Sequence, residues 1–153
     1  MAAIAVGAFG FYKAAEIFSP GRYPYAETYE LPYPEEKVKE AIVKFKQKNP
    51  EYLVPKITIQ NQGSLDLADE PTKDPSYWYK FYFYYKSENQ ILFTWTSSLS
   101  KDKTTLAFVS INNGLDIGYW KDINKDFSGA DNKEQKKIFE ERILNKIKDE
   151  LKK

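Results

Sequence analysis

A nine-residue segment in the middle of the chain is almost entirely aromatic. From Tyr77 to Tyr85, every residue except Lys80 carries a ring. So much apolar surface is costly to leave in water, and aromatic residues favour strands, so we expect a sheet strand that is covered on at least one face. Successive side chains of a strand point to opposite faces, so the odd-numbered and even-numbered residues form two separate surfaces.

The two faces of this strand differ in chemistry. The odd face is predicted to be core and consists of Tyr77, Tyr79, Phe81, Phe83 and Tyr85. The even face has a polar tip on nearly every residue and consists of Trp78, Lys80, Tyr82, Tyr84 and Lys86. Tyr and Trp combine a large contact area with a hydrogen-bonding group, so we predict that the even face binds a protein partner or stacks a planar ligand. The structural alternative is that the N-terminal segment or the loop at 61–76 lies across it.

Composition excludes several classes of function. The net charge is +1 and only Arg22 and Arg142 offer guanidinium groups, so the chain lacks the basic surface that nucleic-acid binding requires. There is no Cys and no His, which excludes thiolate nucleophiles, disulfides, the common zinc sites and triads with an imidazole base. Nothing in the sequence indicates a cofactor. We therefore predict that the chain is not an enzyme and needs no cofactor or metal.

Two acidic segments offer alternative chemistry that the sequence supports poorly. The loop at 61–76 contains Asp66, Asp69, Glu70 and Asp74, but nothing fixes the separation of two carboxylates that sugar hydrolysis needs. A calcium loop is suggested by Asp122, Asn124, Asp126, Ser128, Asp131 and Glu134. Phe127 stands where the calcium pattern requires glycine, so a solvated loop with helix-capping acids is the better interpretation.

Residues 1–19 are predicted to form an apolar helix. The stretch from Ala2 to Tyr12 has no charge, and Ser19-Pro20-Gly21 ends the helix. Eighteen helical residues reach roughly 27 Å, close to the thickness of the hydrocarbon layer. We expect residues 1–18 to contact a membrane as the latter half of an anchor, on a side that the sequence does not assign. The alternative is a helix that packs on its own domain in a cytoplasmic protein.

The remaining residues, 20–153, are predicted to form one α+β domain. We expect strands at 25–31 and 55–60, a meander of three strands over 77–112 and a short edge piece at 115–120. Amphipathic helices are expected at 35–47 and from Asp131, the predicted cap, to the C-terminus. The simplest arrangement is an antiparallel sheet of about four to five strands with both helices packed on one face.

These expectations lead to a non-catalytic, membrane-tethered domain that binds a protein partner. The even face of the aromatic strand and the acidic loop at 61–76 would supply the contact surface. An immunity or inhibitor protein, which acts by occlusion, would fit this description. The alternative is a small-molecule carrier with an aromatic pocket between the sheet and the helices.

Overall fold

This computed structural model describes residues 24–72 and 78–153, in which one strand and one helix precede a run of strands and a C-terminal helix closes the chain. The elements are β1 (Glu27–Leu31), α1 (Glu35–Lys48), η1 (Pro50–Tyr52), β2 (Ile57–Ile59), β3 (Gln62–Leu65), β4 (Glu70–Pro71), β5 (Tyr79–Tyr85), β6 (Gln90–Ser100), β7 (Lys103–Asn113), β8 (Asp116–Ile117), β9 (Trp120–Asp122), α2 (Gly129–Phe139), η2 (Glu140–Leu144) and α3 (Asn145–Leu151). The predicted anchor helix at 1–19 lies outside the described residues. Within them, no helix has the length and apolar character needed to cross a membrane.

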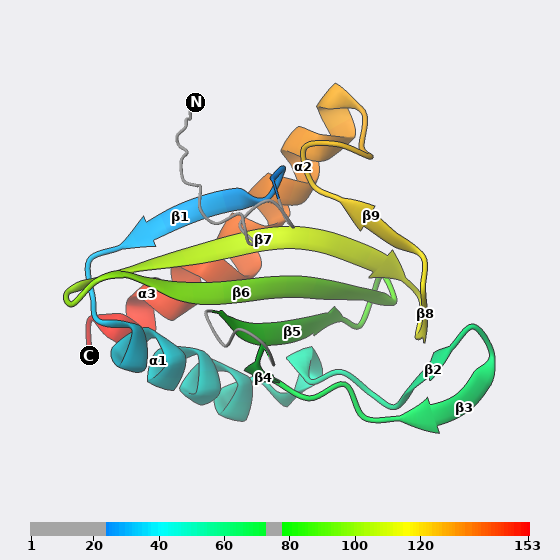
Figure 1. The fold of residues 1–153 in the computed structure, drawn as a ribbon, viewed down its shortest axis with the longest axis horizontal. Helices are drawn as coiled ribbons and strands as arrows, with labels where there is room; N and C mark the ends of the chain where they lie inside the picture. The colour runs from blue at the N-terminus through cyan, green and yellow to red at the C-terminus, as the bar shows by residue number, and fades with distance from the viewer. Residues whose placement is uncertain (1–23, 73–77) are drawn as a thin grey trace.

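The α+β class is confirmed, with an antiparallel main sheet in the order β1-β7-β6-β5-β4 (Figure 1). The predicted meander is its centre, because β5, β6 and β7 follow one another along the chain and pair as neighbours. β9 also pairs with β7, so the sheet has six strands rather than four or five. The additional strand, β4, comes from the segment predicted as a loop, where Glu70 and Pro71 pair with Lys80 and Tyr79.

A second, small sheet in the order β3-β2-β8 was not predicted. Part of the expected loop at 61–76 is strand β3, which forms a hairpin with β2. The turn of this hairpin is Gln60-Asn61, whose φ angles of 51° and 62° suit a two-residue hairpin connection. β8 joins β2 in parallel, and the Asp116 carboxylate accepts hydrogen bonds from Thr58 Oγ1 (2.6 Å) and Asn61 N (2.7 Å).

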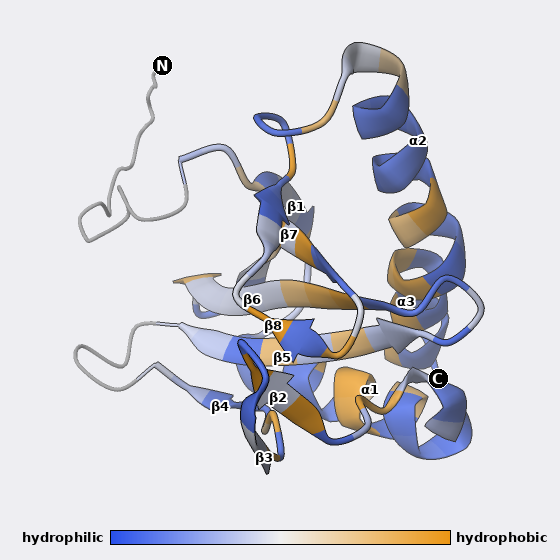
Figure 2. Ribbon diagram, turned by 90° about the vertical axis from the view of Figure 1, so that its right-hand side faces the viewer, coloured by the Kyte–Doolittle hydropathy of each residue, from blue (hydrophilic) through white to orange (hydrophobic). Residues whose placement is uncertain are grey.

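All the long helices lie on one side of the main sheet, as Figure 2 shows. α1 buries Val38, Ala41, Ile42 and Phe45, four residues on one apolar stripe. The C-terminal helix contains a π-helical segment, η2, between α2 and α3. It begins at Gly129 rather than Asp131, because the cap is Ser128, whose hydroxyl accepts a hydrogen bond from the Asp131 amide.

The odd face of β5 is core, as predicted. Phe81, Phe83 and Tyr85 are buried in one cluster with the apolar residues of α1 and of the C-terminal helix, and Tyr79 packs against its margin. Tyr77 lies outside the described residues. This face therefore supplies the main hydrophobic core of the domain.

The even face of β5 is not an open surface, which corrects the sequence-based picture. Tyr82 and Tyr84 are buried in a second cluster with Ile91, Phe93, Trp95, Ala107 and Val109. Most of the residues that cover this cluster come from the small sheet and its flanking segments: Val54, Ile57, Leu67, Leu115 and Ile117. Trp120, on β9 at the edge of the main sheet, also packs against the cluster. The alternative of a structural cover is thus partly realised, with Leu67 as the contribution of the 61–76 segment.

Candidate functional site

Among residues 24–72 and 78–153, the segments that cover the even face leave a cavity of about 350 Å³. We call it the second-face cavity; its lining residues are Leu67, Lys80, Tyr82, Phe93, Val109, Ser110, Ile117, Trp120 and Asp122. The register of the strands explains why many of these residues lie together. Tyr82 pairs with Phe93, Phe93 with Ser110, and Ser110 with Asp122, so one row of residues crosses four strands.

A β-bulge shapes the floor of the cavity. Phe93 pairs with Ser110 whereas Thr94 pairs with Phe108, so Val109 is an extra residue on β7. Val109 and Ser110 consequently both line the cavity, although adjacent residues of a regular strand point to opposite faces. Bulges of this kind re-aim side chains, and they are common beside functional sites.

Three aromatic rings surround the cavity. Tyr82 and Phe93 lie nearly parallel, with ring centroids 5.3 Å apart and an angle of 22° between the ring planes. Trp120 stands at 62° to Phe93, at a centroid distance of 6.2 Å, and its centroid lies 6.4 Å from that of Tyr82. The first two rings form a continuous surface, and the indole forms a wall at an angle to it.

Two charged side chains lie at opposite ends of the cavity. Lys80 is on β5 and pairs with Glu70 at 3.4 Å, whereas Asp122 is on β9. Three inter-strand spacings separate these strands, which is roughly 14 Å of sheet. Burial raises the pKa of Asp122, and repulsion from Asp126 raises it further, against the attraction of Lys125. A perturbed carboxyl group in a cavity is a common property of functional sites.

The five predicted binding residues lie in different places in the structure. Lys80 and Tyr82 line the second-face cavity. Trp78 stacks on Trp95 beside it, with ring centroids 4.9 Å apart. Tyr84 is buried on the same face, but its hydroxyl donates to Asn89 Oδ1 (2.6 Å) at the far end of the strand.

The fifth predicted residue, Lys86, is exposed in the turn after β5. Sequence reasoning did not assign Phe93, Ser110 or Trp120 to a site, and it weighed Asp122 only as part of a calcium loop. The alternation of Ile91, Phe93 and Trp95 was a usable signal for Phe93, because it placed these residues on one face. No local signal distinguished Asp122 from the other acids of its loop.

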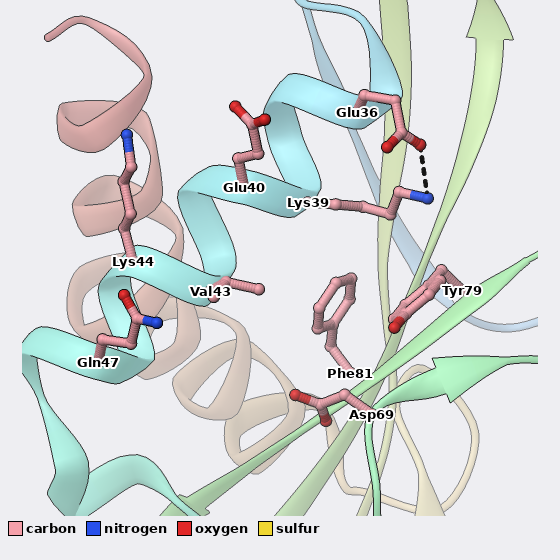
Figure 3. Close-up of a pocket in the computed structure, with 9 residues that line it drawn as sticks. All are labelled: Glu36, Lys39, Glu40, Val43, Lys44, Gln47, Asp69, Tyr79 and Phe81. Carbon is pink, nitrogen blue, oxygen red and sulfur yellow. Dashed lines mark ion pairs between the residues drawn. The ribbon is translucent and has the colours of Figure 1, made fainter.

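A second hollow lies between α1 and the outer edge of β5 (Figure 3). Its volume is about 580 Å³, and it is lined by Glu36, Lys39, Glu40, Val43, Lys44, Gln47, Asp69, Tyr79 and Phe81. Lys39 pairs with Glu36 at 2.7 Å and lies 4.8 Å from the Tyr79 ring centroid. This groove is the only one of the two that lies between sheet and helix, the place expected for a carrier pocket, but its helical wall is mainly charged and exposed.

A short segment, Leu67–Pro71, separates the two hollows. Leu67 lines the second-face cavity and Asp69 lines the groove. The buried Lys46 ammonium donates to Asp69 Oδ2 (2.6 Å) and to the backbone carbonyl of Tyr82, while Asp69 Oδ1 accepts from Tyr82 N (2.9 Å). We call Leu67–Pro71 the strap. Its ion pair satisfies both backbone groups of Tyr82 on the outer edge of β5 and so blocks further strand pairing at that residue.

In the segment with calcium-like spacing, 122–134, polar groups form hydrogen bonds to other groups of the protein. Asp126 Oδ2 accepts from the Asp122 amide (2.7 Å), and Asn124 Nδ2 donates to the Tyr25 carbonyl (2.7 Å). Ser128 caps α2. In residues 24–72 and 78–153, no group of three or more acidic side chains is placed to hold a metal ion.

Comparison of the chain with known protein families, with curated proteins and with solved structures finds no match. The function is therefore inferred from the geometry of the site itself. Unlike the groove beside α1, the second-face cavity combines aromatic walls with a few polar groups at defined ends. That combination is characteristic of ligand sites.

Proposed function

We propose that the protein is a non-catalytic binding domain and that the second-face cavity takes a small, partly aromatic ligand. One observation carries this proposal: a cavity of about 350 Å³ has three rings on its walls and a single charged group at each end. Ligand sites typically measure about 300–1,000 Å³ and are mainly apolar, with a few polar groups that fix orientation. The proposal retains the carrier alternative but moves its pocket to the sheet face away from the helices.

The separation of the charged groups favours binding over catalysis. Acid–base chemistry requires ionisable groups within hydrogen-bonding reach of one reacting centre. Lys80 and Asp122 stand on strands that are roughly 14 Å apart. They are placed to hold the two ends of a ligand rather than to act together on one bond.

A protein partner is the second candidate function. The apolar side chains of Ile59 and Leu65 on the small sheet, and of Tyr119 after it, are exposed near the cover of the cavity. Such residues suit contact with another protein. An immunity-like or inhibitor-like role and a membrane tether at 1–18 stay predictions, and burial of Tyr82 and Tyr84 removes the broad aromatic surface on which that role first depended.

Indole is a suitable first probe, because it matches the aromatic walls and has a polar N–H group. We expect the full chain to bind indole in ligand-observed NMR. Ser110→Phe should abolish binding by filling the cavity, whereas Val43→Phe, a matched substitution in the α1 groove, should leave it unchanged. If Ser110→Phe does not fold, Leu67→Trp fills the cavity from the cover instead. Wild-type-like binding by a folded cavity-filling variant, or no binding by the wild type, would overturn the proposal.

A further inference from the structure

We infer that the ligand of the second-face cavity carries an organic cation, an alkylammonium group, which sits against Trp120 with the Asp122 carboxylate as its counter-ion. This inference rests on the proposed function, since it names the ligand group that one end of the cavity takes. Three features of the cavity support it: the angle between its rings, the placement of Asp122 and the neutralisation of its other end.

The rings form a corner that suits a cation. Trp120 and Phe93 are inclined at 62°, and their centroids are 6.2 Å apart. A cation in the angle between these planes lies within about 6 Å of both centroids, the range over which the face of an aromatic ring attracts positive charge. Trp is the strongest of the aromatic residues in this interaction, and rings set at angles are the usual recognition element for alkylated ammonium groups.

Asp122 lies beside this corner. Trp120 and Asp122 are two residues apart on β9, so their side chains leave the same face of the strand. Phe93 on β6 pairs with Ser110 on β7, which pairs with Asp122 on β9. Asp122 therefore lies two strands away from Phe93 in the same row. Burial and the neighbouring Asp126 disfavour the charged form of this carboxylate and Lys125 favours it; a bound cation would stabilise the charged form further.

The charge at the other end of the cavity also favours a ligand whose cation lies beside Asp122. Lys80, the cation among the lining residues, belongs to the opposite end of the cavity and is paired there with Glu70. An organic cation fits the Asp122 end better than a metal ion. Hard metal ions require several oxygen ligands, whereas this corner offers one carboxylate and apolar rings.

Choline and 3,3-dimethylbutan-1-ol provide the test, because they have the same shape and differ in the charged nitrogen. We expect wild-type protein to bind choline at least tenfold more tightly than the alcohol in NMR titrations. Asp122→Asn should remove most of this preference, and Trp120→Leu should weaken choline binding at least tenfold. Asp66→Asn removes the same charge at an exposed position. It should change neither the preference for choline over the alcohol nor the affinity for choline.

The possible outcomes separate this inference from the proposed function. Equal affinity for the two probes, or an unchanged preference in folded Asp122→Asn, would overturn the cation assignment while indole binding would still support the cavity. Failure of indole to bind would remove the proposed function itself. If Trp120→Leu unfolds, Trp120→Phe keeps a ring at the corner and should show an intermediate loss of choline affinity.

Discussion

The two faces of the main sheet receive side chains from the same aromatic strand but are closed in different ways. On the helix side, Phe83 is 0% exposed beneath α1 and the C-terminal helix. On the other side, Tyr82 is 8% exposed beneath a small sheet that leaves a cavity. Both faces are thus dry over most of their area, but the described residues fill only the helix side.

The length of the covering elements explains this difference. α1 has 14 residues and spans roughly 21 Å, whereas β2 has 3 residues and spans roughly 10 Å. The two long strands beneath them, β6 and β7, have 11 residues each. A long helix with a continuous apolar stripe covers such a sheet, and a three-residue strand does not. An aromatic face can therefore serve stability or binding, depending on which elements cover it.

Matched truncations on the two faces should have the largest effect and test the comparison directly. Phe83→Ala removes a fully buried ring from a packed core and should lower the free energy of unfolding by about 4 kcal/mol. Phe93→Ala removes a ring that already borders a cavity and should cost about half as much, because fewer surrounding atoms lose contacts. Urea denaturation of both variants measures the difference, and equal costs would show that the two faces are packed alike.

The strap lies at the boundary between the two hollows, so its anchoring affects both faces of the sheet. Lys46→Met removes the ammonium that holds Asp69 and the Tyr82 carbonyl, leaving a partly buried carboxylate unpaired. We expect a loss of about 2 kcal/mol in the free energy of unfolding.

Lys48→Met is the matched control for this substitution. It breaks a pair with Glu150 in which the lysine is half exposed, and Lys153 still pairs with that carboxylate at 3.2 Å, so the cost should be less than about 1 kcal/mol. Urea denaturation gives both values. A cost for Lys46→Met no greater than that for Lys48→Met would mean that the strap is held by its two β4 pairings rather than by the ion pair.

The helix-covered face could be predicted from sequence because its signals are local. Alternation along 77–85 assigned Phe81 and Phe83 to the core, and the apolar stripe of α1 predicted which of its residues face the sheet. The cover of the other face depends on contacts between distant segments. The sequence predicts a short edge piece at 115–120, but it does not indicate that this segment divides between β8, which pairs with β2, and β9, which pairs with β7. Nothing in Gln60-Asn61 requires the positive φ angles that form the β2–β3 hairpin. The candidate site was therefore predicted only where β5 supplies it, at Lys80 and Tyr82.

The smallest expected effect concerns an ion pair at the rim of the helix-covered face. Arg142 donates from Nη1 to Glu88 Oε1 (3.0 Å) and from Nη2 to Glu88 Oε2 (2.7 Å). These hydrogen bonds lower the pKa of Glu88 to about 2, from an ordinary value of 4.5. Because the folded-state pKa is depressed, the stabilisation is present above pH 4.5 and is lost as the pH falls towards 2. Both side chains are 36% exposed, so solvent screening limits the contribution at neutral pH to less than about 1 kcal/mol.

A double-mutant cycle with Glu88→Gln and Arg142→Gln isolates this contribution. Urea denaturation at pH 7 should give a favourable coupling energy of a few tenths of a kcal/mol, and at pH 2 the coupling should fall towards zero as Glu88 becomes protonated. Arg142 also lies 4.8 Å from the Tyr85 ring centroid, so Arg142→Gln alone should cost more than Glu88→Gln at both pH values. A coupling that persists unchanged at pH 2 would contradict the assigned pKa. A coupling as large as the cost of Lys46→Met would mean that the rim of the helix-covered face is held as firmly as the strap.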